Sequence, residues 1–361
     1  MTRTSILTAL LIIAVCALPA DRAWAHIGTG IAVDSNGRVC FADTIHNCIW
    51  RIDGDGKLTL LATDQHTNGL AAHEDGSLYI VEGAVRRITP LGGATEVPSS
   101  AEFQTVAGPA FAMDRQGNIY FLKVDAQCKG EYKIMKRTPE GTISLLAGSD
   151  RGYADGKGAE AKFSHLNSAA CGPDGSLYVR DGNSIRKVPP GGTVSTLTGG
   201  AVAGFVGTEE EDLQRPLGLA VDATGYVYVA HYWKRRVFKV TPCGEVSTLA
   251  QTTWPWIPTG VAVAMNDVYI LERLGNPYAW SSLLAALFFA ENLRVRKISS
   301  GGRITTLATV RGWTKFSFIA WALFLLALSV VFALVLTARW LLSRAARRKP
   351  GQWSEYPPAV R

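Results

Sequence analysis

The chain has 361 residues, of which 47% are hydrophobic and 19% charged, and its formal net charge is +7. That charge is concentrated at the ends, because residues 1–25 contribute +1 and the tail from Arg339 onward contributes +5. The region between them is left with only +1, so the basic balance does not indicate a nucleic-acid-binding domain.

The first 25 residues have the pattern of a secretory signal peptide. Arg3 is followed by an apolar stretch from Ile6 to Leu18 and then by Ala23-Trp24-Ala25, which has the small-x-small form of a cleavage site. We expect the mature chain to start at His26.

Six copies of one repeat follow, each with two anchor positions seven residues apart. A small residue and a short apolar stretch precede a polar turn ending in Gly, or Asp in the last copy, and an alternating strand follows. The copies are Gly30-IAVDSN-Gly37-RVCFAD, Gly69-LAAHED-Gly76-SLYIVE, Ala110-FAMDRQ-Gly117-NIYFLK, Ser168-AACGPD-Gly175-SLYVRD, Gly218-LAVDAT-Gly225-YVYVAH and Gly260-VAVAMN-Asp267-VYILE.

Each copy continues into a second segment of period-two alternation around a Gly-containing turn, such as SIRKVPPGGTVSTLTG in the fourth. The pattern predicts four strands per unit in six units. The expected fold class is therefore all-β, a six-bladed β-propeller of four-stranded antiparallel blades over residues 26–308.

The repeat resembles that of NHL-repeat propellers. The stretch GIAVDSNGRVCFADTIHNCIWRIDGDGKLTLLA follows the family's repeat, and GYADGKGAEAKFSHLNS before the fourth unit is similar to a linker that some members carry. The resemblance covers Gly28 to Ala308 and implies a scaffold rather than a particular chemistry, since functions within the family are mixed.

The lengths of the connections distinguish the two faces of the expected propeller. If the strands of a blade are named a to d, the a–b and c–d turns emerge on one face and the b–c and d–a loops on the other. The first set is uniformly tight. The insertions Asp125–Glu131, Ser149–Leu166, Ala201–Pro216 and Arg273–Asn292 all belong to the second set. We call that side the loop-rich face and expect binding there.

Polar residues at the expected ends of the b strands form a second candidate site. These ring residues are Asp43, Glu82, Lys123, Asp181, His231 and Glu272. For Asp43 and Asp181, hydrogen bonding to their own b–c turns is an alternative role. The predicted ligand-binding residues are Glu82, Lys123, Asp181, His231 and Glu272; no catalytic residue is predicted.

Asn68 and Asn167 each precede a strand-a anchor, and here the chain resembles the gluconolactonase and senescence-marker propellers. In those proteins the resemblance implies one divalent metal, such as Ca or Zn, held by Asn, Asp and Glu side chains. The other matching positions of this chain carry no carboxylate: Thr29, Pro109, Leu217 and Thr259. Amides alone would hold a hard divalent cation weakly, so the first expectation is that no cofactor is needed. The alternative function is a metal-dependent hydrolase or lactonase centred on Asn68 and Asn167, with Glu82 or Asp181 supplying a carboxylate.

The insertion before the last hairpin contains SSLLAALFFA, an uncharged apolar run from Ser281 to Ala290. Three interpretations stay open: packing against a blade edge, contact with a membrane, and docking on the membrane helices of a partner protein. The candidate membrane-contact residues are Tyr278, Trp280, Leu283, Leu284, Leu287, Phe288 and Phe289.

Residues 316–338 lack charge and would span about 34 Å as a helix, against about 30 Å for a hydrocarbon core. They predict a transmembrane helix after a short linker, 309–315. Basic residues in the tail, 339–361, place that tail in the cytoplasm and the propeller outside.

The sequence thus predicts a single-pass inner-membrane protein of a bacterial envelope, N-out and C-in, with its loop-rich face toward the lipid. The expected role is a binding scaffold for an envelope protein or a small envelope ligand, with lipid as a further partner. The patterns name neither the ligand nor the oligomeric state.

Overall fold

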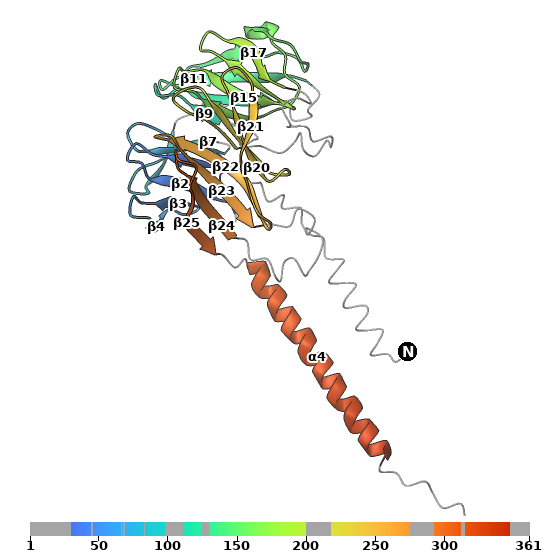
Figure 1. The fold of residues 1–361 in the computed structure, drawn as a ribbon. Coiled ribbons are helices and arrows are strands. Elements are labelled where there is room, and N and C mark those ends of the chain that lie inside the picture. Colours follow the sequence, from blue (N-terminus) through green and yellow to red (C-terminus); the bar gives the residue numbers. More distant parts are fainter. Residues whose placement is uncertain are drawn as a thin grey trace, which may run out of the picture.

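The structure is a computed structural model that describes residues 30–44, 46–65, 67, 69–82, 84–97, 111–124, 130–199, 218–274, 292–311 and 315–346. The chain forms six antiparallel sheets in sequence order, followed by one long helix (Figure 1). Each sheet is one blade, and the four repeat strands of a blade are neighbours in chain order. The six-bladed propeller of four-stranded blades expected from the repeats is confirmed.

The strands have the following bounds. Blades 1 to 3 comprise β1 Ile31–Val33, β2 Val39–Asp43, β3 Cys48–Ile52, β4 Leu58–Ala62; β5 Ala71–Ala72, β6 Leu78–Glu82, β7 Ala84–Ile88, β8 Ala94–Val97; and β9 Phe111–Met113, β10 Ile119–Val124, β11 Tyr132–Arg137, β12 Ile143–Ala147. Blades 4 to 6 comprise β14 Leu166–Cys171, β15 Leu177–Asp181, β16 Ser184–Val188, β17 Thr193–Thr198; β18 Gly218–Val221, β19 Val227–His231, β20 Arg236–Val240, β21 Val246–Gln251; and β22 Trp256–Ala264, β23 Asp267–Leu274, β24 Asn292–Ile298, β25 Ile304–Arg311.

The tight turns form as the glycine spacing predicts. In the a–b turn of blade 1, the N–H of Gly37 donates to the carbonyl of Asp34 at 2.9 Å, and Gly37 has a φ of 75°. A side chain there would be strained, since this is the left-handed region that Gly adopts readily. The Asp34 carboxylate also accepts from the backbone of Asn36 and Arg38, which fixes the turn from its start.

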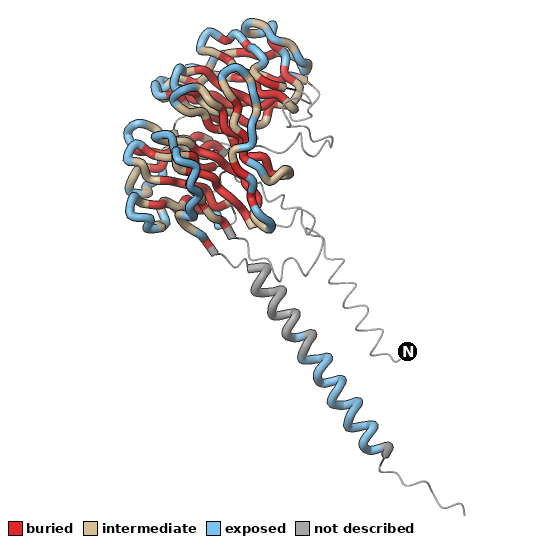
Figure 2. Tube along the Cα trace, viewed as in Figure 1, coloured by how far each residue is buried: buried red, intermediate tan, exposed pale blue. Residues whose placement is uncertain are grey.

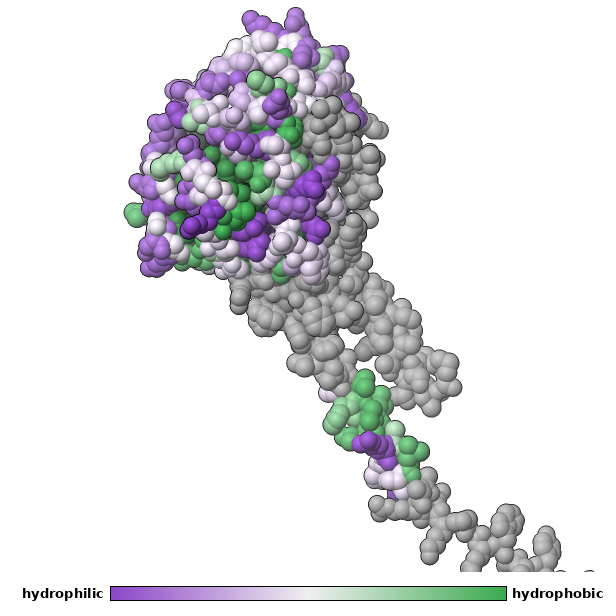
Figure 3. Space-filling view, viewed as in Figure 1, coloured by the Kyte–Doolittle hydropathy of each residue, from purple (hydrophilic) through white to green (hydrophobic). Residues whose placement is uncertain are grey.

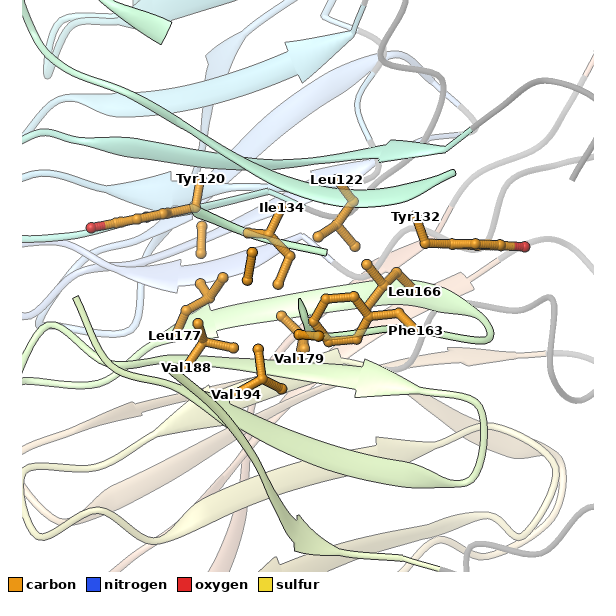
Figure 4. Close-up of a cluster of buried hydrophobic side chains, with 13 residues drawn as sticks. Tyr120, Leu122, Tyr132, Ile134, Phe163, Leu166, Leu177, Val179, Val188 and Val194 are labelled. Atoms are coloured by element: carbon orange, nitrogen blue, oxygen red, sulfur yellow. The ribbon is translucent and has the colours of Figure 1, made fainter. Parts of the chain in front are cut away.

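The hydrophobic core is divided among the six interfaces between neighbouring blades (Figure 2). Figure 4 shows the interface of blades 3 and 4, where Tyr120, Leu122 and Ile134 lie against Leu177 and Val179. Strand side chains point alternately to the two faces of a sheet, so each blade supplies apolar side chains to both of its neighbours. This explains why the b strands are almost wholly apolar rather than half polar.

The ring closes between the first and last blades. Ile31 and Phe41 of blade 1 share one buried cluster with Leu271, Val295 and Val310 of blade 6. Every strand of these two blades comes from its own repeat. Among the described residues, closure therefore rests on packing between the faces of two blades, and no strand is exchanged between them.

Blade 4 differs from the simple repeat, because its sheet has five strands. The linker before it forms β13, Gly156–Lys157, which pairs with β17 at the outer edge, followed by a short 3-10 turn, η2, Gly158–Glu160. The sequence predicts a loop throughout this linker, and β13 is an addition to it. A two-residue strand has too little alternation to be predicted from sequence.

Strand pairing places the variable connections on one face. Trp256 pairs with Leu274, and Asn292 pairs with Arg311, so β22 begins, β23 ends, β24 begins and β25 ends on the loop-rich face. Strand β25 reaches Arg311, whereas the sequence suggested a linker from residue 309. The helix α4, Lys315–Ala346, follows after residues 312–314 and extends away from the propeller (Figure 1).

Candidate functional site

The central channel contains a small cavity lined by residues from all six blades. Its volume is about 50 Å³, whereas pockets for small organic ligands have volumes of roughly 300–1,000 Å³. The lining residues are Ile31, Gly69, Leu70, Phe111, Asn167, Ser168, Ala169, Gly218, Leu219 and Val261. None of the ring residues is among them. This part of the channel has room for a few water molecules but not for a sugar or lactone ring.

Asp181 ends β15 and is buried within blade 4 and its linker. One carboxylate oxygen accepts hydrogen bonds from the backbone N–H groups of Ser164 and His165, at 2.7 and 2.9 Å, and from the Ser164 hydroxyl. The other oxygen accepts from the Arg186 guanidinium at 2.7 Å. Both oxygens are therefore engaged, which favours a structural role for Asp181 over ligand binding.

Glu272 lies within β23 and is fully buried. Its two carboxylate oxygens accept from the guanidinium groups of Arg294 and Arg296 on the adjacent strand β24. Arg294 also stacks over the ring of Trp256, 4.1 Å from its centroid. A buried carboxylate with two charge-assisted partners is held strongly, so Glu272 positions blade 6 rather than presenting a free acid.

Register explains these pairs. Asp181 lies opposite Ser184 and Glu272 opposite Arg294, so Arg186 and Arg296 are equivalent, each two residues further along strand c. The equivalent residue of blade 1 is Trp50, whose indole N–H donates to Asp43 at 3.3 Å. Three acidic ring residues thus meet a hydrogen-bond donor at the same repeat position.

The remaining ring residues have varied surroundings. His231 is buried at the end of β19, where its ring packs edge-on against Phe238 with a centroid separation of 6.0 Å. Lys123 is exposed in β10, opposite Lys133. Glu82 ends β6, and only its backbone is described. Ligand contact by these three residues stays a prediction. Of the two side chains that are described, Lys123 is exposed and His231 is buried.

The suggested metal positions do not form a site for a hard divalent cation among the described residues. Asn167 lines the channel cavity, but the described lining contains no carboxylate. Thr259 is buried and its hydroxyl donates to the carbonyl of Leu271 at 3.4 Å, and Asn68 lies outside the described residues. The part of the chain that the structure describes contains no group of three His, Cys, Asp or Glu side chains arranged for a metal. Neutral amide and hydroxyl oxygens alone would hold a divalent cation only weakly.

The linker before blade 4 forms a clamp that the sequence did not reveal. Arg186 is wholly buried between the rings of Tyr153 and Phe163, with its guanidinium carbon 4.5 and 5.4 Å from their centroids. A second carboxylate, that of Asp155, accepts from Arg186 at 2.6 Å. The Gly-Tyr-x-Asp-Gly motif was the available signal, but its partner Arg186 lies on a different strand.

The acidity of Asp155 reflects this clamp. Burial acts to raise the pKa of its carboxyl group, but hydrogen bonds from the Thr196 backbone and the Arg186 guanidinium hold the pKa below its ordinary value. Asp155 is therefore ionised at any physiological pH. One buried arginine joins two carboxylates and ties the linker to its blade.

The candidate membrane-contact residues Tyr278, Trp280, Leu283, Leu284, Leu287, Phe288 and Phe289 lie outside the described residues, as does the expected signal peptide. The segment 316–338 falls within α4. Among the described residues, no helix meets the requirements of length and apolarity for crossing a membrane. The membrane helix therefore stays a prediction from the sequence.

No protein-family model and no curated protein matches the chain. Among solved structures, a calcium-binding protein described as regucalcin, from Agrobacterium tumefaciens strain C58, is 13% identical with a TM-score of 0.53, covering 80% of this chain and 93% of its own. A luciferin-regenerating enzyme is 15% identical with a TM-score of 0.50, covering 68% and 83%. A streptogramin B lyase is 17% identical with a TM-score of 0.48, covering 77% and 81%. At these identities the likeness establishes a propeller fold alone, and the NHL resemblance stays a prediction.

Proposed function

We propose that this protein is a membrane-anchored extracytoplasmic propeller that acts as a binding scaffold through its loop-rich face. The observation that carries the binding assignment is the internal engagement of Asp181 and Glu272 by arginines. Each oxygen of these two carboxylates already accepts a hydrogen bond within the propeller, which disfavours their use as a general acid or base. The small volume of the described channel cavity also supports a binding role for the loop-rich face.

Anchoring is supported by the composition and exposure of α4. Its described side chains are mostly hydrophobic (Figure 3), and large apolar residues such as Leu326, Phe332 and Leu336 are exposed along it. A helix that exposes apolar side chains needs an apolar environment. Because β25 ends on the loop-rich face just before α4, the same face is proposed to lie toward the lipid and the tail in the cytoplasm.

Anchoring is tested by extracting cell membranes with alkaline carbonate. The full chain should stay in the membrane pellet, and a variant with Leu326→Lys, Val330→Lys and Phe332→Lys should be released. A matched control with Leu60→Lys, Leu91→Lys and Leu145→Lys changes three exposed apolar residues of the propeller. Release of the unaltered chain would contradict the proposal.

A metal-dependent hydrolase is the second candidate, because Asn167 lines the channel cavity. The two candidates are separated by elemental analysis of the purified full chain after dialysis against trace calcium and zinc. The binding scaffold predicts no stoichiometric ion. About one ion per chain, lost in both Asn68→Ala and Asn167→Ala, would favour the hydrolase and justify a screen of lactones and esters.

A further inference from the structure

The b–c turn of blade 5 carries a concentration of basic and aromatic residues. Its sequence, from the end of β19 to the start of β20, is His-Tyr-Trp-Lys-Arg-Arg. The exposed Trp254 lies in the following d–a loop, with 61% of its surface accessible. We call this set the basic–aromatic patch: Trp233, Lys234, Arg235, Arg236 and Trp254.

Hydrogen bonds join the two parts of the patch. The Thr252 N–H donates to the carbonyl of Arg235 at 2.8 Å, and the Thr252 hydroxyl donates to the carbonyl of Trp256 at 2.9 Å. The turn itself is closed by the Arg235 N–H, which donates to the carbonyl of Tyr232 at 3.1 Å. The backbone that carries the patch residues is therefore held in place before any partner binds.

One tryptophan of the patch is anchored in the protein and the other projects from it. Trp233 packs on the buried Tyr232 and Ile257, and its ring meets that of Tyr232 at an interplanar angle of 84°. Trp254 belongs to no buried cluster of the described residues. By contrast, Trp256, two residues later, is covered by Arg294. Trp254 is thus available to a partner outside the described fold.

The positive charge of the two arginines of the patch is not balanced within the described residues. Arg236 is exposed, and neither Arg235 nor Arg236 has a carboxylate partner among the described residues. Basic residues elsewhere in the propeller are commonly paired, as in Arg87 with Asp75 and Lys297 with Asp267. Two arginines without a carboxylate partner in one turn indicate an anionic binding partner.

The described b–c connections of blades 1 and 4 lack this feature. The described connections between strands b and c contain Thr44, His46 and Asn47 in blade 1 and only Gly182 and Asn183 in blade 4. A turn of two residues would close the hairpin equally well. The basic residues of the blade 5 turn are therefore not required to close the hairpin.

The position of the patch on the loop-rich face favours a membrane surface as its partner. Pairing of His231 with Arg236, and of Arg236 with Gln251, places it on the loop-rich face, where β25 also ends before α4. Tryptophan favours the interfacial region of a bilayer, and Lys and Arg bind anionic headgroups. We propose that the basic–aromatic patch binds the surface of the anchoring membrane through anionic lipid headgroups. This proposal rests on the membrane anchor of the proposed function and adds an orientation to it, with blade 5 against the lipid.

The test uses the full chain in lipid nanodiscs of phosphatidylcholine, with or without about one-third phosphatidylglycerol, and a nitroxide-labelled headgroup as quencher. We expect stronger tryptophan quenching in the anionic discs, and loss of that increment in Trp254→Phe. The paired variant Arg235→Glu with Arg236→Glu should behave as in neutral discs, because each basic residue near an anionic surface contributes about fivefold in partition. The matched control, Lys57→Glu with Arg303→Glu on the tight-turn face, should quench like the unaltered chain.

Four outcomes would overturn the proposal. Equal quenching in both kinds of disc removes the role of anionic lipid, while co-elution of the chain with the discs would leave the anchor intact. Thermal destabilisation of the arginine variant with unchanged quenching would show that these arginines pair within the chain, for instance with the acidic run 209–212. A photocrosslinker at position 254 that captures protein rather than lipid in native membranes would replace the membrane by an acidic protein partner. Failure to enter discs would instead refute the anchor, and this proposal with it.

Discussion

Blades 4 and 6 bury the same kind of residue at the same repeat position and neutralise it in opposite ways. In blade 4 one arginine, Arg186, lies between two carboxylates, Asp181 and Asp155. In blade 6 one carboxylate, Glu272, lies between two arginines, Arg294 and Arg296. The first group has a formal charge of −1 and depends on the linker, whereas the second has +1 and is confined to its own sheet.

The difference shows that the position is a structural one whose chemistry is set across the hairpin. A buried carboxylate is tolerated only when hydrogen-bond donors reach it, and strand c provides them at a fixed offset. Where the ring residue is His231 instead, the residue at that offset is Phe238, which offers an aromatic ring rather than a donor. The ring residue of strand b and its partner on strand c therefore differ together from blade to blade, so the two residues have to be interpreted as a pair.

The largest effect is expected for Arg186→Met, which removes the cation between the two carboxylates of blade 4. The change leaves Asp181 buried without its cation and releases Asp155, so the free energy of unfolding should fall by about 3–5 kcal/mol. Urea unfolding followed by circular dichroism measures the loss. If the variant nearly fails to fold, Arg186→Lys should restore part of the stability, because the charge is kept but the paired contacts are not. A loss below about 1 kcal/mol would refute the clamp.

The equivalent change in blade 6, Arg296→Met, should cost less. Glu272 keeps Arg294, so the loss is that of one hydrogen bond to a charged group, about 1.5–3 kcal/mol. The same urea titration applies. Equal losses of unfolding free energy in Arg186→Met and Arg296→Met would mean that Arg294 does not compensate for the loss of Arg296. The proposed difference between the two blades would then be wrong.

The aromatic cover of Arg186 should contribute a smaller amount. Tyr153 is half exposed, and its ring lies over the guanidinium while its hydroxyl is 3.0 Å from that of Ser184. Tyr153→Leu should cost about 1–2 kcal/mol, from the cation–π contact and the hydrogen bond together. Tyr153→Phe is the matched control that keeps only the ring, and it should retain about half of that stability.

The smallest expected effect is on pH dependence. Because the folded pKa of Asp155 is lowered, its contribution is fully present above the unfolded pKa of about 3.9 and is lost as pH falls through the folded value. Asp155→Asn should therefore flatten the acid limb of the stability curve below about pH 4. Thermal melts between pH 2 and pH 7 measure this, and an unchanged acid limb would show that Asp155 is not linked to folding.

Much of the fold could be predicted because each repeat encodes its own blade. Anchors seven residues apart, glycines at the turns and alternating strands recur in six copies. A repeat with a weak pattern can therefore be recognised by comparison with the other five. The loop-rich face followed from connection lengths alone. Both inferences use local sequence, which is where the information for hairpins lies.

The candidate site was harder to predict, since it depends on contacts between strands. Asp181 and Glu272 were identified as polar residues in an apolar pattern, but their partners Arg186 and Arg296 could be recognised only from strand register. The strand β13 was missed for a related reason, because two residues carry no periodicity. Exposure of Trp254 likewise depends on how its loop is tied to Arg235.

The seam between blades 1 and 6 has a kinetic consequence. Five interfaces join consecutive blades, but this one brings Ile31 together with Val310, from opposite ends of the propeller. Loop closure over such a length is entropically costly, and contacts of high sequence separation form slowly. During synthesis the first blade must keep its apolar face uncovered until the last hairpin is complete, immediately before α4 emerges. The interval before closure is when the chain is most exposed to aggregation, and it ends only as the final strand arrives.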